Sequence, residues 1–406
     1  MIKSHSICKL ICLLLFFLNA YAVFAQEFRS TPYPDRIVLT WSGDPSKTQT
    51  VTWRTDLSIQ DAKAQIKQED SSPDMEKSVQ EYPAVSQPFT GNGDVQDRYH
   101  HVQFSGLKPG TVYVYRVGDS ARWSEWNQFR TADVADSDSS FSFIYLGDGQ
   151  NDLKSRWSRT VRQAFRAQPD ARFIIHTGDL INRPNTDTEW GEWHYGAGFI
   201  HRIIPAVPTP GNHEYFRDEQ KRLLLDPHWS AQFTLPQNGP ANTEAVYFLD
   251  YQKVRIIALN SQLIMLDSVA REAQLRWLED ILKNNNQQWT IVMMHHPVYS
   301  TSKRRDNAEL RELFKPLFDQ YGVDLVLQGH DHTYARGRGP GAHAKGPMYV
   351  VSVAGPKMYE SDSDRWMDVA LTETQFYQTI QISDRNLEYN AYKVSGELFD
   401  SFTISK

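Results

Sequence analysis

Residues 323–336 (VDLVLQGHDHTYAR) are the segment that most constrains the fold and function of this chain. The apolar run 323–327 predicts a short buried strand that ends at Gly329. His330 and His332 follow at once, separated by one residue. Side chains two apart at the end of a strand point the same way, so both imidazoles face one site. Because imidazole is the commonest side-chain metal ligand, this spacing predicts a metal site if other strands end in oxygen ligands.

Other apolar runs do end in such residues. Candidate strands 141–146, 173–176, 254–259 and 289–294 alternate with helical segments, of which 271–282 is the clearest. Buried strands separated by helices indicate an α/β domain, whose ligand-bearing residues lie just beyond the carboxyl ends of the strands. The candidate ligands at these positions are Asp148, Asp179, Asn182, Asn212, His295, His330 and His332.

This set of ligands indicates two metal ions. Carboxylates together with imidazoles suit borderline or hard cations such as zinc, iron or manganese. Two carboxylates and three imidazoles exceed what one tetrahedral catalytic metal uses, since such a metal keeps a position open. Two metals ~3.5–4 Å apart, bridged by a carboxylate and a hydroxide, fit the set better. Glycine precedes Asp148, Asp179, Asn212 and His330, which lets the backbone turn sharply beside the cations.

Residues 1–25 predict a targeting signal. Lys3 and Lys9 form a basic region, residues 10–18 are apolar, and Val23 and Ala25 suit a cleavage site before Gln26. An uncleaved membrane anchor is the alternative, but the apolar run is short for a span. No later stretch of the sequence is long and apolar enough to cross a bilayer. We therefore expect an exported protein, secreted or periplasmic.

Cleavage of this signal also changes the composition. Both cysteines, Cys8 and Cys12, lie within it, so the mature chain excludes disulfides and thiol catalysis. The full chain has 43 Lys and Arg against 49 Asp and Glu; loss of Lys3 and Lys9 leaves 41 and a net charge of −8. This balance argues against a protein that coats nucleic acid, and it is compatible with a small anionic substrate held by metal.

Residues 26–132 predict an all-β domain. Alternating runs at 36–41 and 48–53, and at 100–104 and 112–117, are separated by turns, whereas the polar stretch 56–97 predicts loops. The domain resembles a fibronectin type III-like sandwich, in which Tyr113 would form the tyrosine corner. Residues 133–140 are small and acidic and predict a linker. Alternating strands return from residue 376 and are expected to close the sheets of the domain 141–406.

The ordered blocks DxG, GDxxx, GNHE, VxxH and GHxH resemble the calcineurin-like metallophosphoesterases, and the fibronectin-like preface and terminal DSFTISK resemble the purple acid phosphatases. The resemblance implies an α+β multidomain chain with a four-layer α/β/β/α catalytic domain. It also implies that one metal takes Asp148, His332 and bridging Asp179, and that His213 steadies the phosphate or protonates the leaving group. The other metal would take Asp179, Asn212, His295 and His330.

The chain departs from the purple acid phosphatases in two places. Asn182 stands where the family has the tyrosine that binds iron(III), so Asn182 is either a ligand or a residue of the surrounding turn. Plant members carry phosphate-binding histidines after the VxxH block, where this chain has a basic loop. The expected substrate contacts there are His296, Lys303, Arg304 and Arg305, the alternative being an exposed basic loop.

The expected reaction is in-line attack on a phosphate monoester by a metal-bridging hydroxide, with His213 as proton donor. A phosphodiesterase acting on nucleotides or lipid headgroups is the second candidate, since fold does not settle the substrate. A secreted binding module that has lost catalysis is the third. Without the tyrosine we expect two divalent ions rather than iron(III), a colourless protein and a pH optimum near neutral or above. Between two ligand blocks, an aromatic group indicates helix packing or a pocket: Trp190, Trp193, Tyr195 and Phe199.

Overall fold

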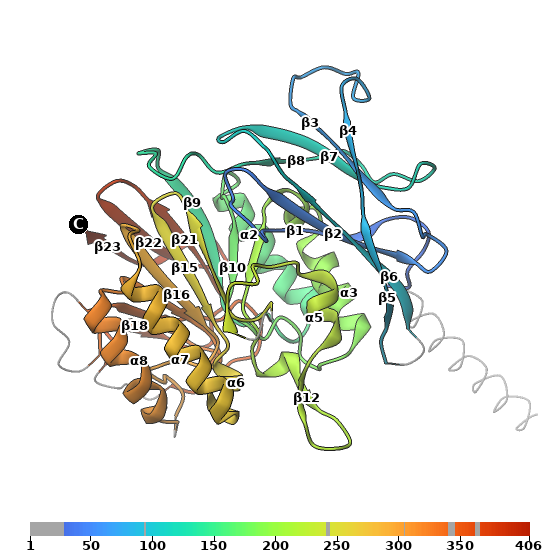
Figure 1. The fold of residues 1–406 in the computed structure, drawn as a ribbon. Helices are drawn as coiled ribbons and strands as arrows, with labels where there is room; N and C mark the ends of the chain where they lie inside the picture. The colour runs from blue at the N-terminus through green and yellow to red at the C-terminus, as the bar shows by residue number, and fades with distance from the viewer. Residues whose placement is uncertain (1–27, 93–94, 241–243, 304, 340–345, 362–365) are drawn as a thin grey trace, which may run out of the picture.

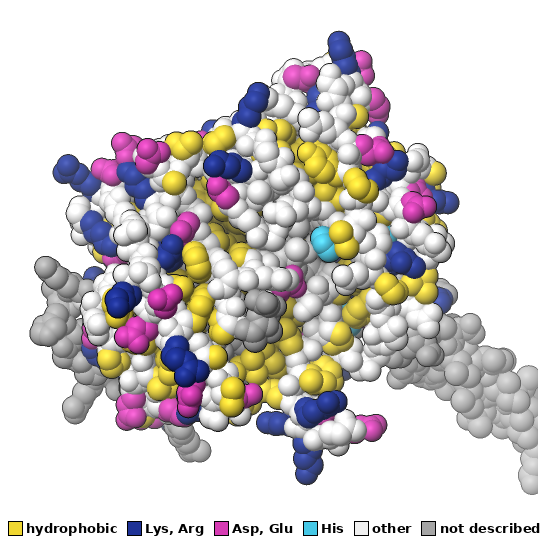
Figure 2. All heavy atoms as spheres, in the orientation of Figure 1, with side chains coloured by type: hydrophobic (Ala, Val, Ile, Leu, Met, Phe, Trp, Pro, Cys, Tyr) yellow, Lys and Arg dark blue, Asp and Glu magenta, His cyan; other side chains and the backbone are white. Residues whose placement is uncertain are grey.

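The computed structural model describes residues 28–92, 95–240, 244–303, 305–339, 346–361 and 366–406. The expected targeting signal, residues 1–25, and the expected substrate contact Arg304 lie outside the described residues. Within the described residues, no helix is long and apolar enough to cross a membrane. Figure 2 shows acidic and basic side chains interspersed over the face in view.

The N-terminal domain consists of two sheets packed face to face (Figure 1). Its core joins side chains from both sheets, including Trp53 and Tyr115. The Tyr113 hydroxyl accepts a hydrogen bond from the backbone N–H of Lys108, 2.9 Å away and five residues upstream, as in a tyrosine corner. In spatial order, one sheet contains β1 (Asp35–Thr40), β2 (Gln49–Asp56), β6 (Gln96–Phe104) and β5 (Val85–Thr90), and the other contains β4 (Gln80–Pro83), β3 (Lys63–Gln68), β7 (Val112–Gly118) and β8 (Asn127–Arg130).

Strands β3, β4 and β5 lie within residues 56–97, so the expectation of loops there is wrong. In β3, Ala64 and Ile66 are buried and Gln65 between them is not, which is the period-two pattern of a strand. The run is short and its inward side chains are few among polar neighbours. The hydrophobic signal was therefore too weak to separate strand from loop.

The C-terminal domain contains two large sheets, which share one hydrophobic core that includes Ile144 and Ile256, and a two-stranded sheet of β12 (Tyr215–Arg217) and β13 (Leu223–Leu225). One sheet has the order β11 (Ala206–Pro208), β10 (Ile174–His176), β9 (Phe141–Leu146), β21 (Phe376–Ile382), β22 (Asn386–Lys393) and β23 (Leu398–Ser405). The other has β14 (Tyr247–Tyr251), β15 (Val254–Leu259), β16 (Trp289–Met294), β17 (Leu325–Gln328), β19 (Met348–Val351), β18 (Tyr334–Gly337) and β20 (Val369–Leu371).

Helices cover the outer faces of both sheets. α2 (Ser158–Ala167) contacts β9 and β21 and packs against α3 (Asp187–Ala197). α6 (Ser261–Leu266), α7 (Ser268–Lys283) and α8 (Ala308–Tyr321) lie on the other side in Figure 1, where Leu278 and Phe314 pack against Val292 of β16. These layers confirm the expected α+β multidomain fold with helices outside two packed sheets.

The strands that precede the candidate ligands run parallel. β9, β10 and β11 are parallel neighbours in one sheet, as are β15, β16 and β17 in the other. β21 pairs with β9 antiparallel, so the terminal strands join the same sheet, as the sequence predicted. The carboxyl ends of the parallel strands therefore deliver their loops to one edge of the domain.

A buried ionic network joins the two domains. Arg36 of β1 donates to both carboxylate oxygens of Asp187, the first residue of α3, at 2.7 and 2.9 Å. Arg54 of β2 lies 3.4 Å from the same carboxylate. His228 contacts Asp187 at 3.3 Å through Nε2 and Asp226 at 2.8 Å through Nδ1. The N-terminal sandwich is thus attached to the start of a catalytic-domain helix.

Candidate metal centre

Three candidate ligands adopt backbone conformations that side chains other than glycine rarely take. Asp179 has a φ of 51°, His330 of 72° and His332 of 49°. Such left-handed residues cost free energy and persist where the surrounding structure enforces them, which is common at functional sites. The turns bring Asp179 and His332 close to Asp148, which follows β9, and His330 close to His295.

One group of potential ligand atoms belongs to Asp148, Asp179 and His332, whose donor atoms all lie within 4.8 Å of one another. Nε2 of His332 is 3.1 Å from Oδ2 of Asp148. Within the part of the chain that the structure describes, this buried oxygen has no hydrogen-bond partner. A buried carboxylate oxygen without a donor is costly, and a bound cation would satisfy it.

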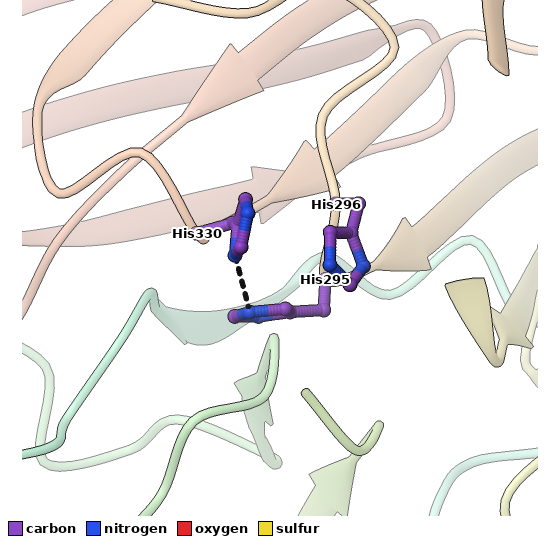
Figure 3. A group of neighbouring side chains, drawn as sticks. All are labelled: His295, His296 and His330. Atoms are coloured by element: carbon purple, nitrogen blue, oxygen red, sulfur yellow. Dashed lines mark hydrogen bonds between the residues drawn. The ribbon is translucent and has the colours of Figure 1, made fainter. Parts of the chain in front are cut away.

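A second group surrounds His295 (Figure 3). Nε2 of His295 is 3.1 Å from Nδ1 of His330, 3.1 Å from Oδ1 of Asn212 and 3.3 Å from Oδ2 of Asp179. Asp179 therefore contacts this second group as well as belonging to the first. Burial opposes a charge on His295, but the carboxylates of Asp179 and Asp148 outweigh it and raise its pKa to about 9. The site thus attracts positive charge, which metal cations would also supply.

Hydrogen bonds fix the orientation of two histidine rings. Nδ1 of His295 is 2.8 Å from the carbonyl oxygen of Thr177, and Nδ1 of His332 is 2.9 Å from that of Lys357. A ring nitrogen beside a carbonyl oxygen keeps its proton, so Nε2 is the nitrogen that gives up its proton and binds when a cation replaces that proton. The imidazoles, carboxylates and amide oxygen assembled here therefore fit borderline divalent cations.

His296 does not occupy the position expected of a substrate contact. Its ring is buried and packs 4.2 Å from that of His330, and its Nδ1 is 2.9 Å from the Ser261 hydroxyl. Burial and the neighbouring His295 lower its pKa well below the usual value, which keeps the ring neutral. Figure 3 shows its ring beside the His295–His330 contact, and a ligand atom of His296 lies within 4.8 Å of those of both residues. This buried position beside the ligands differs from that of an exposed substrate contact.

His213 lies at the partly exposed side of the site, with 24% of its side-chain surface accessible. Its backbone N–H donates to Oδ1 of Asp179 at 2.9 Å, and its Nδ1 is 2.5 Å from the carbonyl oxygen of Asn182. With Nδ1 anchored in this way, Nε2 lies 3.9 Å from Oδ2 of Asp179. This nitrogen is placed to exchange a proton with a group bound at the site.

Asn182 contacts the site through its main chain. Its carbonyl oxygen lies 2.5 Å from Nδ1 of His213, and its N–H donates to Glu189 at 2.7 Å. The residue also lines a neighbouring hollow. The other six candidate ligands lie together, whereas the hydrogen bonds described for Asn182 are made by its main chain. Its position favours a turn residue over a metal ligand.

The basic loop does not point its charges at the site. Arg305 pairs with buried Asp331, and Lys303 lies 3.5 Å from Glu360. Both side chains are occupied, so the expectation that they grip phosphate is not supported by their positions. Lys357 also lies near the centre, and its ammonium group is 3.4 Å from Oε1 of Gln150.

Sequence analysis missed three residues of this site, namely Gln150, Glu214 and Lys357. Gln150 donates to Oδ2 of Asp179 at 2.7 Å. Buried Glu214 accepts four backbone N–H groups, from Gly211 and the segment 179–181. Burial and the charge of Asp179 raise the pKa of Glu214, whereas the N–H groups that it accepts lower it and favour the carboxylate. Glu214 is the last residue of the GNHE block and Gln150 lies two residues after Asp148, which was the available signal, whereas Lys357 lies in no block.

The fold and the site together define a metallophosphoesterase. Residues 117–334 match the calcineurin-like phosphoesterase family model, and residues 34–131 match that of the purple acid phosphatase N-terminal domain. The chain belongs to the calcineurin-like phosphoesterases, and it is a phosphatase of the purple acid phosphatase type.

Known relatives agree with this assignment. The chain is 28% identical to mouse acid phosphatase type 7 over 340 residues, which cover 77% of this chain and 72% of the relative. It is 26% identical to purple acid phosphatase 15 of Arabidopsis thaliana, covering 62% of this chain and 52% of that protein. The solved purple acid phosphatase PPD1 from yellow lupin has the same fold, with a TM-score of 0.77 at 19% identity, over 92% of this chain and 74% of the lupin chain.

Proposed function

We propose that this protein is an exported phosphate monoesterase that works with two divalent cations. The observation that carries the proposal is the position of Asp179, which belongs to one group of ligand atoms and lies 3.3 Å from His295 in the other. One cation would be held by Asp148, Asp179 and His332, and the other by Asp179, Asn212, His295 and His330. When bound, the pair would supply an activated water and neutralise charge that develops on the phosphate oxygens.

Residues of the chain would transfer the proton and bind the phosphate. His213, held through Nδ1 by the Asn182 carbonyl, would carry on Nε2 the proton that passes to the leaving-group oxygen. Lys357 lies beside Gln150, and its ammonium group would contact a phosphate oxygen. Glu214 would hold the loops of Asp179 and Asn212 at a fixed separation.

Three observations support the finer parts of this proposal. The basic, apolar and small-residue pattern of residues 1–25 supports export. The absence of a tyrosine at position 182 supports divalent ions over iron(III), since an anionic phenolate would be needed to stabilise the higher charge. Phosphate monoesters are favoured because relatives include a protein named phosphoenolpyruvate phosphatase from Allium cepa, which is 26% identical over 256 residues.

Hydrolysis of p-nitrophenyl phosphate and of its bis ester, with metal content measured on the same sample, tests the proposal. We expect faster turnover of the monoester and two metal ions per chain. Asp179→Asn should abolish turnover and lower the bound metal, because it weakens the carboxylate shared by both groups. Two metals and near-normal turnover in that variant would refute the dinuclear assignment, and faster hydrolysis of the bis ester would make the protein a phosphodiesterase.

A further inference from the structure

A hollow of about 650 Å³ lies beside the candidate metal centre, and we call it the leaving-group hollow. Asn182 and Asn151 are among its lining residues. Asn182 is joined to the centre because its carbonyl binds Nδ1 of His213. Asn151 directly follows Gln150, which donates to Asp179. The hollow therefore adjoins the residue that would protonate a leaving group.

The wall of this hollow has an unusual backbone. Asn151 and Asp152 are consecutive left-handed residues, with φ of 70° and 47°, and the π-helix η1 (Leu153–Trp157) follows them. Left-handed conformations at non-glycine residues and π-helices are both frequent at functional sites. Oδ1 of Asn151 is buried and has no hydrogen-bond partner within the described residues. The strained turn thus holds a buried acceptor without a partner behind the wall of the hollow.

The charges that line the hollow balance. Three acidic side chains face three basic ones, and one of these pairs, Arg183 with Glu189, is joined at 2.7 Å. A balanced lining offers little attraction to a second phosphate group or to a cationic headgroup. The remaining chemistry is polar and neutral, from side chains such as Asn151, Asn182 and Thr188.

Tyr195 supplies the one aromatic surface among the residues that line the hollow, and 52% of its surface is exposed. The other aromatic residues noted in the sequence lie elsewhere. Trp190 and Trp193 are fully buried in the core, and Phe199 is exposed but packs on Phe165. Lys154 and Arg162 lie over the Tyr195 ring, 5.1 and 6.0 Å from its centre, so this aromatic surface adjoins charged as well as neutral hydrogen-bonding groups. An aromatic wall with a few polar groups is the usual construction of a small-molecule site, and the volume is within the range of such sites.

We propose that the leaving-group hollow binds the neutral, polyhydroxylated alcohol portion of the substrate, so that the natural substrate is a sugar phosphate. Polar lining residues such as Asn182 and Thr188 hydrogen-bond its hydroxyl groups, and the exposed part of Tyr195 contacts its ring. This inference rests on the proposed phosphate monoesterase function. It also gives a role to the Asn182 side chain.

The test compares glucose 6-phosphate with ethyl phosphate, which has no hydroxyl groups beyond its ester. We expect Asn182→Ala and Tyr195→Ala each to lower the ratio of kcat/KM for glucose 6-phosphate over ethyl phosphate by about tenfold, the effect of one lost contact. Tyr195→Phe should keep most of the ratio. Phe199→Ala is the matched control, because Phe199 is equally exposed near the same helix but does not line the hollow. Its ratio should equal that of the wild type.

The possible outcomes separate the two proposals. A wild-type protein that hydrolyses neither ester would overturn the monoesterase function itself. A wild type that hydrolyses ethyl phosphate as well as glucose 6-phosphate, or variants that leave the ratio unchanged, would overturn the hollow assignment alone. Adenosine 5′-monophosphate is the third substrate. If the variants lose kcat/KM for this substrate alone, the hollow binds a nucleoside base and the sugar assignment is overturned. Metal content and melting temperature of each variant confirm that it is folded.

Discussion

Replacement of Glu214 by glutamine tests whether this buried carboxylate sets the separation of the two ligand loops. One oxygen of Glu214 accepts the N–H groups of Leu180 and Ile181, and the other accepts those of Asp179 and Gly211. In Glu214→Gln an NH₂ group replaces one oxygen and faces two donors. Each buried N–H left without an acceptor costs ~1–3 kcal/mol, so the variant should lose about 2–6 kcal/mol of unfolding free energy.

Urea unfolding and equilibrium dialysis against zinc measure the two consequences. We expect Glu214→Gln to be less stable and to bind metal more weakly, because the loops of Asp179 and Asn212 lose their common anchor. Glu219→Gln is the control, since Glu219 is exposed in the same segment and should change stability by less than ~0.5 kcal/mol. If Glu214→Gln keeps wild-type stability and metal affinity, the carboxylate does not organise the site.

Three further predictions concern the proton donor, the domain junction and position 182. His213→Ala should retain metal but lose ~10²–10⁴-fold in turnover, with a larger loss for ethyl phosphate than for p-nitrophenyl phosphate, and equal losses would leave only phosphate binding. Asp187→Asn leaves buried Arg36 without its carboxylate and should cost ~3–5 kcal/mol in urea unfolding; a loss under ~1 kcal/mol would contradict this. Burial opposes the charges of Asp187 and His228, but their mutual contact and further partners lower the pKa of Asp187 and raise that of His228. The stability from Asp187 is fully present above about pH 4, its pKa in the unfolded chain, and is lost progressively as pH falls below that value. The stability from His228 is fully present below about pH 6.5 and is lost as pH rises through its raised pKa in the folded chain. An unfolding free energy that stays constant between pH 3 and 8 would refute both effects. Asn182→Tyr, loaded with iron in air, should gain a visible absorption band that the wild type lacks, and a purple wild type would contradict the divalent assignment.

The catalytic fold was predictable because its strands are buried on both faces. The runs 141–146, 254–259 and 289–294 are continuous and apolar, and each forms the strand that the sequence indicates. Parallel strands end at one edge, which is why His295 and His330 could be expected beside Asp179 before their contacts were known. The N-terminal strand β3 was missed because its inward residues are few.

Contacts between distant polar residues could not be predicted from local patterns. Lys357 and Gln150 are 207 positions apart. No apolar or periodic sequence pattern around either residue predicts that they are in contact. Arg305 was expected to bind phosphate because no sequence pattern marks its partner, Asp331, which lies between the two histidines of the GHxH block. Polar side chains acquire their roles from partners that the folded chain supplies.

Position 182 shows how a substitution and the domain junction are connected. The loop that begins at Asn182 is held by Glu189, which accepts the N–H groups of Asn182 and Arg183, and it leads to Asp187 at the start of α3. Asp187 is in turn held by Arg36 of the sandwich. The Asn182 carbonyl orients His213. Because the buried ion pair between the domains holds the end of this loop, it would help to orient the proposed proton donor. We therefore infer that the sandwich helps to position the proposed proton donor.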